Sequence, residues 1–342
     1  MKKILFGLMI GTLLFTACGK KNEVTKNKSI NVYTALENEQ IPVYLESFKE
    51  SHPEIKLNIV RDSTGIIISK LLAEKGNPQA DVVWGTAATG LLLLDKEGLL
   101  EPYSPEGLDR IDKKLRDQNK IPKWVGNNAW MTAFVVNTIE LKKLGLPVPK
   151  NYKDLLNPKY KGLITMSNPA SSGTGYLTVS AILQLMGEDK GWDYLNKLDK
   201  NIGVYVHSGS KPAKMAAAGE YVIGISYGYP GVSLKNSGSP VEVIFPTEGS
   251  GWDSEANALI KKKNMKPEAN VFLNWAISND AMKAYAKQYA ITGADVGAKV
   301  PVGFPANPNK QLIKNDFNWA AENKSEVLAK WESNFGGKNE EK

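Results

Sequence analysis

Short apolar runs alternate with helix-like segments along the first third of the chain. Residues 29–34 alternate apolar and polar side chains as a strand does, and residues 37–51 repeat apolar positions at helical spacing. An apolar run at 57–60, a helical segment at 65–75 and an apolar run at 80–85 follow in that order. Strands that alternate with helices predict βαβ units, so we expect an α/β fold with a mainly parallel sheet.

The same alternation continues to the C-terminal end. Strands are expected at 130–137, 162–166, 202–206, 221–226, 241–246 and 256–260, and helical periodicity covers 267–288 and 315–334. We expect the strands at 130–137 and 256–260 to cross between two domains, each built from separate stretches of the chain. A chain of 342 residues is long enough for two domains.

The segment from Ser167 to Tyr176 is rich in serine, threonine and glycine and lies between an apolar run and a helical segment. Hydroxyl groups and free backbone N–H groups at a helix N-terminus bind anions, and the helix dipole favours negative charge there. The segment therefore predicts a site for a phosphate or phosphonate group. The alternative is a helix N-cap, because Ser, Thr and Gly are favoured at helix starts whether or not a ligand binds. The candidate residues are Asn168, Ser171, Ser172, Gly173 and Thr174.

Polar clusters follow three of the predicted strands. Ligands of parallel α/β sheets bind beyond the carboxyl ends of the strands, so these clusters are expected to line one crevice. They occupy residues 33–37, 61–65 and 84–86. The candidates among them are Thr34, Ala35, Glu37, Asp62, Ser63, Thr64 and Thr86.

A second loop with the same character follows the strand at 202–206. His207, Ser208, Ser210 and Lys211 precede a helical segment, so we expect His207, Ser208 and Ser210 to contact the anion. Alternatively, His207 is a partly buried histidine whose ring is satisfied by the backbone. Tyr227 and Asp253 complete the candidates, since each follows or precedes a predicted strand.

The pattern of the N-terminal 29 residues is typical of a targeting segment rather than of a folded domain. Basic Met1–Lys3 precedes an apolar stretch that ends beside Cys18, the only cysteine, as in a signal peptide with a lipid-modified cysteine. Residues 1–18 are thus expected to be a lipoprotein signal with Cys18 as the lipidation site, and 19–29 a flexible tether. Ordinary secretion with an incidental cysteine is the alternative.

Charge and cysteine content exclude several functional classes. The formal net charge is +7, but residues 1–29 hold six lysines against one glutamate, so only +2 remains for the rest. A body so close to neutral gives no support to nucleic-acid binding. With a single cysteine, neither a disulfide scaffold nor a thiolate metal site can form, and no cofactor is expected.

The loops at 33–37, 168–176 and 207–212 together resemble bacterial family 1 solute-binding proteins of ABC importers. The likeness extends from Ile30 onward, and it is greatest to the branch assigned to 2-aminoethylphosphonate, next to the hexose-phosphate and ferric-iron binders. This resemblance implies a periplasmic-binding-protein-like type II fold, in which two α/β lobes are joined by a two-strand hinge. The expected lobes are 30–132 with 254–302, and 133–253 with 303–342.

The resemblance also implies a role without catalysis. Such a protein captures a small solute between its lobes and delivers it to a membrane permease, which works with an ATPase subunit. The protein is accordingly expected to be a monomer without cofactor or metal, held by its lipid anchor at the extracytoplasmic or periplasmic face of a membrane in the cell envelope. The expected ligand is 2-aminoethylphosphonate, with Glu37, and behind it Asp62 and Asp253, as partners for its ammonium group.

Three other functions stay open at this point. A hexose phosphate or other organophosphate would use the same anion loops, and Gly228 lacks the polar side chain that relatives often carry there. Ferric-iron relatives use adjacent tyrosines as ligands, whereas Tyr227 and Tyr229 are two positions apart. Residues 224–228 match the G-x-S-x-G pattern of serine hydrolases, but both histidines of the chain precede Ser226, an order that this hydrolase fold does not use.

Overall fold

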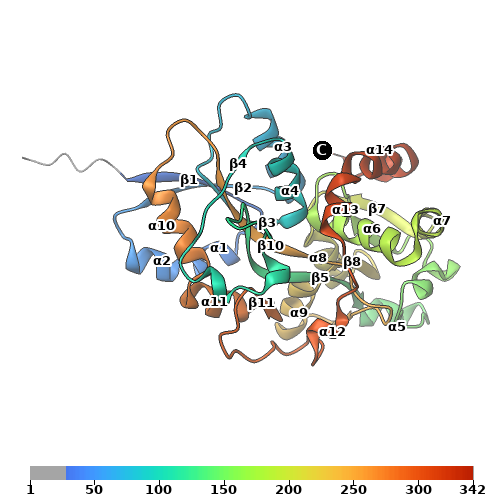
Figure 1. Cartoon of the computed structure of the whole chain (residues 1–342). Coiled ribbons are helices and arrows are strands. Elements are labelled where there is room, and N and C mark those ends of the chain that lie inside the picture. Colours follow the sequence, from blue (N-terminus) through green and yellow to red (C-terminus); the bar gives the residue numbers. More distant parts are fainter. Residues whose placement is uncertain (1–27, 342) are drawn as a thin grey trace, which may run out of the picture.

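The computed structural model describes residues 28–341, and these form a mixed α/β structure with two lobes (Figure 1). Eight strands follow one another in the order β2-β1-β3-β10-β5-β8-β6-β7, while β4 pairs with β10, and β9 and β11 pair with β5. The strands are β1 (Ser29–Thr34), β2 (Lys56–Arg61), β3 (Val82–Ala87), β4 (Leu100–Glu101), β5 (Val125–Asn137), β6 (Ile164–Ser167), β7 (Ile202–Val206), β8 (Ile223–Tyr227), β9 (Val241–Ile244), β10 (Trp252–Ile260) and β11 (Ile291–Thr292).

Helices cover both lobes (Figure 1). The α-helices are α1 (Gln40–Tyr44), α2 (Glu46–Ser51), α3 (Thr64–Ala73), α4 (Ala88–Lys96), α5 (Thr138–Lys143), α6 (Gly173–Met186), α7 (Glu188–Asp199), α8 (Lys211–Ala218), α9 (Gly228–Asn236), α10 (Pro267–Ala276), α11 (Asn279–Ala286), α12 (Pro308–Gln311), α13 (Phe317–Glu322) and α14 (Lys324–Phe335). The single helix expected at 37–51 is wrong, because the chain forms α1 and α2 there, separated at Leu45, whose ψ of −3° departs from helical geometry.

Strand β5 runs through both lobes. Its first half pairs with β10 as far as Met131, and its second half pairs with β8 from Thr132 onward. All 13 residues of β5 are buried, as expected of a strand at the centre of the molecule. The pairing therefore changes lobe between Met131 and Thr132, inside the strand that the sequence identified as a crossing.

The return crossing lies earlier than expected. Strand β10 begins at Trp252 and stays beside β3 and β5 over its whole length, so the crossing expected at 256–260 is wrong. The chain passes between the lobes just before it, where the N–H of Thr132 donates to the carbonyl of Gly251 over 2.8 Å. A side chain at Gly251 would lie 2.3 Å from Cβ of Ala181 in α6, so only glycine fits at this passage.

The sheet is mixed rather than mainly parallel. Strands β1, β2 and β3 are parallel in one lobe, and β6, β7 and β8 are parallel in the other. Strand β5, which crosses between the lobes, is antiparallel to β10, and β10 is antiparallel to β3. The βαβ rule therefore held within each lobe, whereas β5, which joins the lobes, pairs antiparallel with both β10 and β8.

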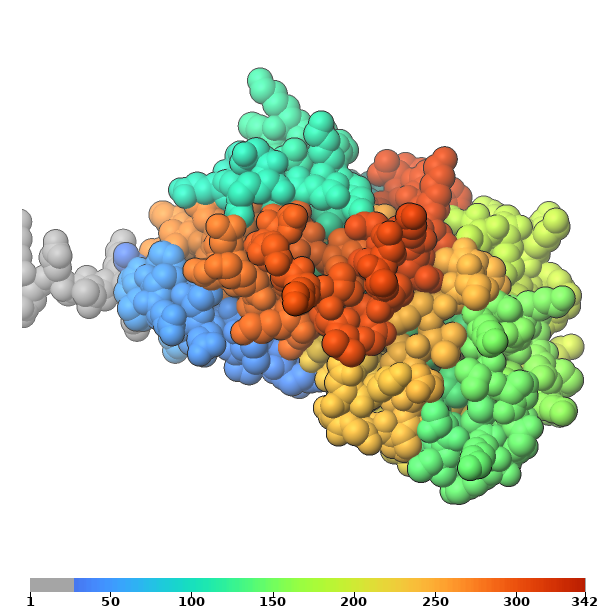
Figure 2. Space-filling view, turned by 90° about the horizontal axis from the view of Figure 1, so that it is seen from below, coloured from blue at the N-terminus to red at the C-terminus, as the bar shows by residue number. Residues whose placement is uncertain are grey.

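Each lobe has a separate aromatic core. Trp84, Phe48 and Phe272 pack edge to face in the first lobe, which we call lobe 1. In lobe 2, Trp331 of α14 packs on Tyr205 of β7 at a ring separation of 4.9 Å, so the C-terminal helix belongs with this lobe. In Figure 2 the orange-red segment that follows β11 lies over the junction of the two lobes.

No helix within residues 28–341 is long and apolar enough to span a membrane. The expected signal sequence and Cys18 lie outside the described residues, as does most of the expected tether.

Candidate functional site

A small cavity of about 40 Å³ lies between the two lobes. The lobes meet around it, and the backbone N–H of Gly65 in α3 donates to the carbonyl of Ser171 across the interface over 2.9 Å. The structure is therefore a closed form of the molecule. The lining residues are Ala35, Glu37, Arg61, Ser63, Thr64, Gly85, Ala87, Trp130 and Glu255 on the lobe 1 side, and Ser172, Gly173, Thr174, Gly209 and Tyr227 on the lobe 2 side.

Four helices begin at this cavity. Ser63, Ala87, Ser172 and Tyr227 are the N-cap residues of α3, α4, α6 and α9, and all four line the cavity. Only Ser172 caps its helix with its own side chain, accepting from the N–H of Gly175 over 3.3 Å. Because the first N–H groups of a helix lack partners within it, and its N-terminus carries partial positive charge, the four ends make the cavity favourable for an anion.

Two carboxylates and one guanidinium face the cavity from lobe 1. Arg61 donates to Glu37 over 3.1 Å and to the carbonyl of Leu36 over 2.8 Å. The hydroxyl of Tyr227, from lobe 2, donates to the other oxygen of Glu37 over 3.2 Å. Glu37 is thus held at the interface by groups from both lobes.

Glu255 is the second carboxylate, and it is almost completely buried. Tyr289 donates to it over 2.6 Å and Asn128 over 2.7 Å. Burial raises the pKa of Glu255 to about 7, although these two hydrogen bonds act to lower it. Near neutral pH this side chain can therefore either donate or accept a hydrogen bond.

Trp130 also lines the cavity. Its side chain is buried, and its Nε1 has no hydrogen-bond partner among residues 28–341. A buried donor without a partner costs free energy, so a ligand atom that accepts from it would bring a gain in binding.

The structure brings eight of the expected site residues together at this cavity. They come from the strand ends and from the loop that precedes α6, as the sequence pattern predicted. They are Ala35, Glu37, Ser63, Thr64, Ser172, Gly173, Thr174 and Tyr227.

Four other expected residues make structural contacts near the cavity without lining it. The hydroxyl of Thr34 accepts from the N–H of Leu36, and Ser171 donates to the carbonyl of His207 over 2.9 Å. Ser208 and Ser210 share a hydrogen bond of 3.2 Å. Their hydroxyls hold the loops in shape, and it is Gly209 between them that reaches the cavity.

The remaining five expected residues are also absent from the cavity lining. His207 and Asp62 face each other across the lobe interface at 3.8 Å, with both side chains 45% exposed. Asp253 is buried beside Thr89, which donates to it over 2.6 Å, and burial raises its pKa to about 6. Asn168 and Thr86 also lie outside the lining, with Thr86 buried inside β3.

Six lining residues were not among the sequence candidates: Arg61, Gly85, Ala87, Trp130, Gly209 and Glu255. A signal for Arg61 and Gly85 was present, since both belong to the polar clusters after predicted strands. Trp130 and Glu255 lie in strands that are buried on both faces, so no alternation of side chains marked which of them turn toward a cavity.

The hydrolase pattern at 224–228 has no catalytic geometry. Ser226 lies inside β8 rather than on a sharp turn after it, is buried, and donates its hydroxyl to the carbonyl of Gly209 over 2.7 Å. Its hydroxyl therefore holds a loop of the cavity.

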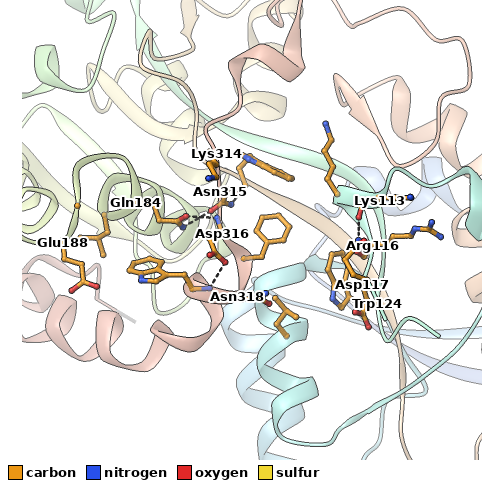
Figure 3. Close-up of a pocket in the computed structure, with 18 residues that line it drawn as sticks. Lys113, Arg116, Asp117, Trp124, Gln184, Glu188, Lys314, Asn315, Asp316 and Asn318 are labelled. Carbon is orange, nitrogen blue, oxygen red and sulfur yellow. Dashed lines mark hydrogen bonds between the residues drawn. The ribbon is translucent and has the colours of Figure 1, made fainter. Parts of the chain in front are cut away.

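A larger depression of about 870 Å³ lies elsewhere between the lobes (Figure 3). Trp124 and Arg116 of lobe 1 face Gln184 of α6 across it, and the segment around Asn315 and Asp316 passes between them. Gln184 donates to Asn315 over 2.8 Å and accepts from the N–H of Asp316 over 2.7 Å. Because these polar groups bind one another and no expected site residue lines the depression, the smaller cavity is the better candidate.

Known proteins are similar to this chain in both sequence and fold. Residues 77–326 match the family model described as bacterial extracellular solute-binding protein. The chain is 32% identical over 309 residues to an uncharacterized protein of Haemophilus influenzae, covering 88% of each. It is 29% identical over 303 residues to the probable ABC transporter periplasmic-binding protein y4fP of Sinorhizobium fredii, covering 86% of this chain and 82% of the relative.

The expected likeness to 2-aminoethylphosphonate binders is narrower. A putative 2-aminoethylphosphonate-binding periplasmic protein of Salmonella paratyphi A is 27% identical over 170 residues, which is 49% of this chain and 47% of the relative. Among solved structures, the periplasmic binding protein AfuA of Actinobacillus pleuropneumoniae with fructose-6-phosphate bound has a TM-score of 0.84 and 30% identity, over 90% of this chain and 99% of AfuA. Iron-bound HitA of Pseudomonas aeruginosa, at 20% identity and a TM-score of 0.74 over 89% and 99% of the two chains, shares the fold.

These matches fit the two lobes, the periplasmic-binding-protein-like fold and the interlobe cavity. They point to an extracellular or periplasmic protein that hands a small solute to permease and ATPase partners. The chain belongs to the bacterial extracellular solute-binding proteins, and it is the substrate-binding component of an ABC transporter and not an enzyme.

Proposed function

We propose that the protein captures 2-aminoethylphosphonate, or a phosphonate or phosphate of similar size, in the interlobe cavity. The observation that carries this proposal is the convergence of the four helix N-termini at one cavity. The hydroxyls of Ser63, Thr64 and Thr174 line it together with these ends. Such donors bind the oxygens of a phosphonate without a cluster of lysines.

The other end of the ligand would meet Glu37 and Glu255. A carboxylate is the natural partner of an ammonium group, and charge-assisted hydrogen bonds of this kind are about twice as strong as neutral ones. Arg61 balances one of the two negative charges, since it pairs with Glu37. A zwitterion with an anionic and a cationic end therefore matches the two sides of the cavity.

The size of the cavity also favours a small ligand. A water molecule needs about 10–15 Å³ of such space, so 40 Å³ accommodates the equivalent of about three or four waters. 2-Aminoethylphosphonate is less than half the size of a hexose phosphate and needs less opening of the lobes to fit.

A hexose phosphate is the second candidate, and one observation favours it. The likeness to AfuA, whose structure holds fructose-6-phosphate, extends over 90% of this chain, whereas the 2-aminoethylphosphonate relative matches only half of it. The same helix ends would bind the phosphate, and Glu37 and Glu255 would accept hydrogen bonds from sugar hydroxyls.

Iron fits the cavity less well. Within residues 28–341, no group of three or more His, Cys, Asp or Glu side chains is placed to hold a metal ion. Burial raises the pKa of Tyr227 well above its ordinary value, and that of Tyr229 to about 12, so both phenols favour the protonated form. A ferric site would need phenolates there.

The envelope features complete the proposal. Residues 1–18 act as a signal peptide, Cys18 carries the lipid, and 19–29 tether a monomer to the extracytoplasmic face of a membrane. We keep the lobes as 30–132 with 254–302, and 133–253 with 303–342; the change of pairing between Met131 and Thr132 supports the first of these boundaries.

A thermal-shift and calorimetry panel on the ligand-stripped protein tests the choice of ligand. A ligand that binds only the folded state raises its stability in proportion to the logarithm of concentration over Kd. We expect 2-aminoethylphosphonate to raise Tm more than ethylphosphonate, fructose 6-phosphate, inorganic phosphate or ferric citrate. Stabilisation by fructose 6-phosphate alone would select the second candidate, and stabilisation by ferric citrate alone would reject the anion site.

A further inference from the structure

The chain beyond α14 turns back over lobe 2 and runs along β7 near the anion loops. Asn339 forms a parallel bridge with Tyr205, and the N–H of Glu340 donates to the carbonyl of Tyr205 over 2.9 Å. Lys338 donates to Asp199 over 3.0 Å and to the carbonyl of Ile202 over 3.1 Å. We call Lys338–Glu340 the C-terminal strap. It covers the edge of the sheet, where β7 would otherwise have no neighbour.

The carboxylate of Glu340 enters the loop between β7 and α8. One of its oxygens accepts from the backbone N–H of His207 and the other from the ammonium of Lys211, the first residue of α8. Partial burial acts to raise the pKa of Glu340, but the bonds from Lys211 and His207 outweigh it and lower that pKa. The loop between β7 and α8, where the sequence predicted a bound anion, thus binds a carboxylate of the same chain.

Asn339 reaches the other anion loop. Asn168 donates to the side-chain oxygen of Asn339 over 2.8 Å and accepts from the N–H of Ala170 over 2.7 Å. The strap therefore fixes the start of the loop that leads to Ser172 and Gly173, both of which line the cavity.

The two loops are also joined to each other. Ser171 donates to the carbonyl of His207 over 2.9 Å, and Ser167 donates to the carbonyl of Ser208 over 3.0 Å. Gly209, between these contacts and α8, lines the cavity, and a side chain there would lie 2.5 Å from the hydroxyl of Thr174. A shift of one loop must therefore disturb the donors that the other presents.

We propose that Glu340 and Asn339 are positioning residues, which hold the outer sides of the two anion loops so that their inner sides bind the solute. The proposal rests on the proposed function, because it takes the solute to be a phosphonate or phosphate. Donors that are held in place before binding need no further ordering, and the ligand then gains affinity. The strap does this from lobe 2 alone and touches no solute.

Hydrogen exchange and calorimetry on three full-length variants test this role. Glu340→Ala removes both acceptors, Glu340→Gln keeps one acceptor for the N–H of His207, and Glu341→Ala is the control, because Glu341 is an exposed neighbour outside the strap. In the ligand-free protein, we expect the amides of His207–Lys211 to exchange faster in Glu340→Ala, less so in Glu340→Gln, and at the wild-type rate in the control.

Affinity for 2-aminoethylphosphonate should follow the same order, with Glu340→Ala weaker than wild type by about tenfold. Unchanged exchange would show that the carboxylate does not hold the loop, and faster exchange with unchanged affinity would show that the loop does not need holding; either result overturns the proposal. A wild-type protein that binds no member of the ligand panel would refute the proposed function, whereas the exchange rates would still decide whether the strap orders the loop.

Discussion

The backbone N–H of Gly65 donates to the carbonyl of Ser171 over 2.9 Å, so the start of α3 in lobe 1 touches the anion loop of lobe 2. The approach is possible only for glycine, since a Cβ at Gly65 would lie 2.1 Å from the carbonyl oxygen of Ala170. That oxygen belongs to the backbone and cannot move aside as a side chain could. The contact therefore reports directly on whether the lobes are closed.

Gly65→Ala should keep the lobes apart. The lobes themselves should remain folded, because alanine is favoured over glycine within a helix by about 1 kcal/mol. Affinity for the solute should fall by at least about tenfold, since only the fraction of molecules that can close binds it. X-ray scattering with saturating ligand should show a larger radius of gyration than wild type.

Gly76→Ala is the matched control for that substitution, because a Cβ at Gly76 meets nothing within 4 Å. Its affinity and scattering should equal those of the wild type. A Gly65→Ala protein that closes and binds normally would show that the contact is dispensable.

Thr174→Val should weaken binding without destabilising the protein. Thr174 lines the cavity, and loss of one hydrogen bond to a charged group costs about 1.5–3 kcal/mol, or about 10- to 150-fold in affinity. Thr178→Val, one turn further along α6, should destabilise the protein without weakening binding. Thr178 donates to the carbonyl of Thr174 over 2.9 Å and is absent from the cavity lining. Calorimetry and thermal melts on both variants measure this crossover, and equal affinities for the two would contradict it.

Glu37→Gln should distinguish an ammonium ligand from a sugar. If Glu37 binds the ammonium group, the variant loses much of its affinity for 2-aminoethylphosphonate and little of its affinity for ethylphosphonate, which lacks that group. Glu39→Gln is the control, since Glu39 is exposed and faces Lys214 at 3.7 Å outside the cavity. Equal losses for the two ligands in calorimetry would remove Glu37 as the ammonium partner.

Glu255→Gln should stabilise the protein more at pH 8 than at pH 5. Burial raises the pKa of Glu255 from 4.5 to about 7, so between these values the folded state holds a proton that the unfolded state has released. The contribution of Glu255 to the free energy of unfolding is therefore fully present below pH 4.5. It is lost as the pH rises through 7, by up to about 3 kcal/mol.

The measurement for Glu255 is Tm against pH for wild type and variant. Glu97→Gln serves as the contrast, because the hydrogen bond from Lys75 lowers the pKa of the partly exposed Glu97, and no gain at pH 8 is expected. A difference in Tm between Glu255→Gln and wild type that is the same at pH 5 and pH 8 would show that Glu255 titrates normally.

Local sequence patterns predicted most of the elements around the cavity. The loop before α6 was identified because strand, N-cap and helix each depend on residues within a few positions of one another. The same holds for Ser63 and Thr64 at the start of α3. Neighbours along the chain decide hydrogen bonding and periodicity at that scale, so their order alone is informative.

Cavity residues that come from distant segments could not be predicted from local patterns. Trp130 and Glu255 reach the cavity from β5 and β10, and no alternation marks their direction because both strands are buried throughout. The antiparallel pairing of these two strands also joins residues more than a hundred positions apart. Burial and pairing of this kind exist only after the chain has closed its long loops.

The loop at His207 shows what local sequence predicts and what only the packing of distant segments decides. Its serines, glycine and lysine before a helix predicted an anion site from the sequence alone. Free N–H groups and a lysine at a helix N-terminus attract negative charge wherever they occur. Which anion approaches was decided by the tertiary structure, since α14 packs on β7 and brings Glu340 to the loop from 133 positions away. Local chemistry determines what a loop can bind, and the packing of distant segments determines what it meets.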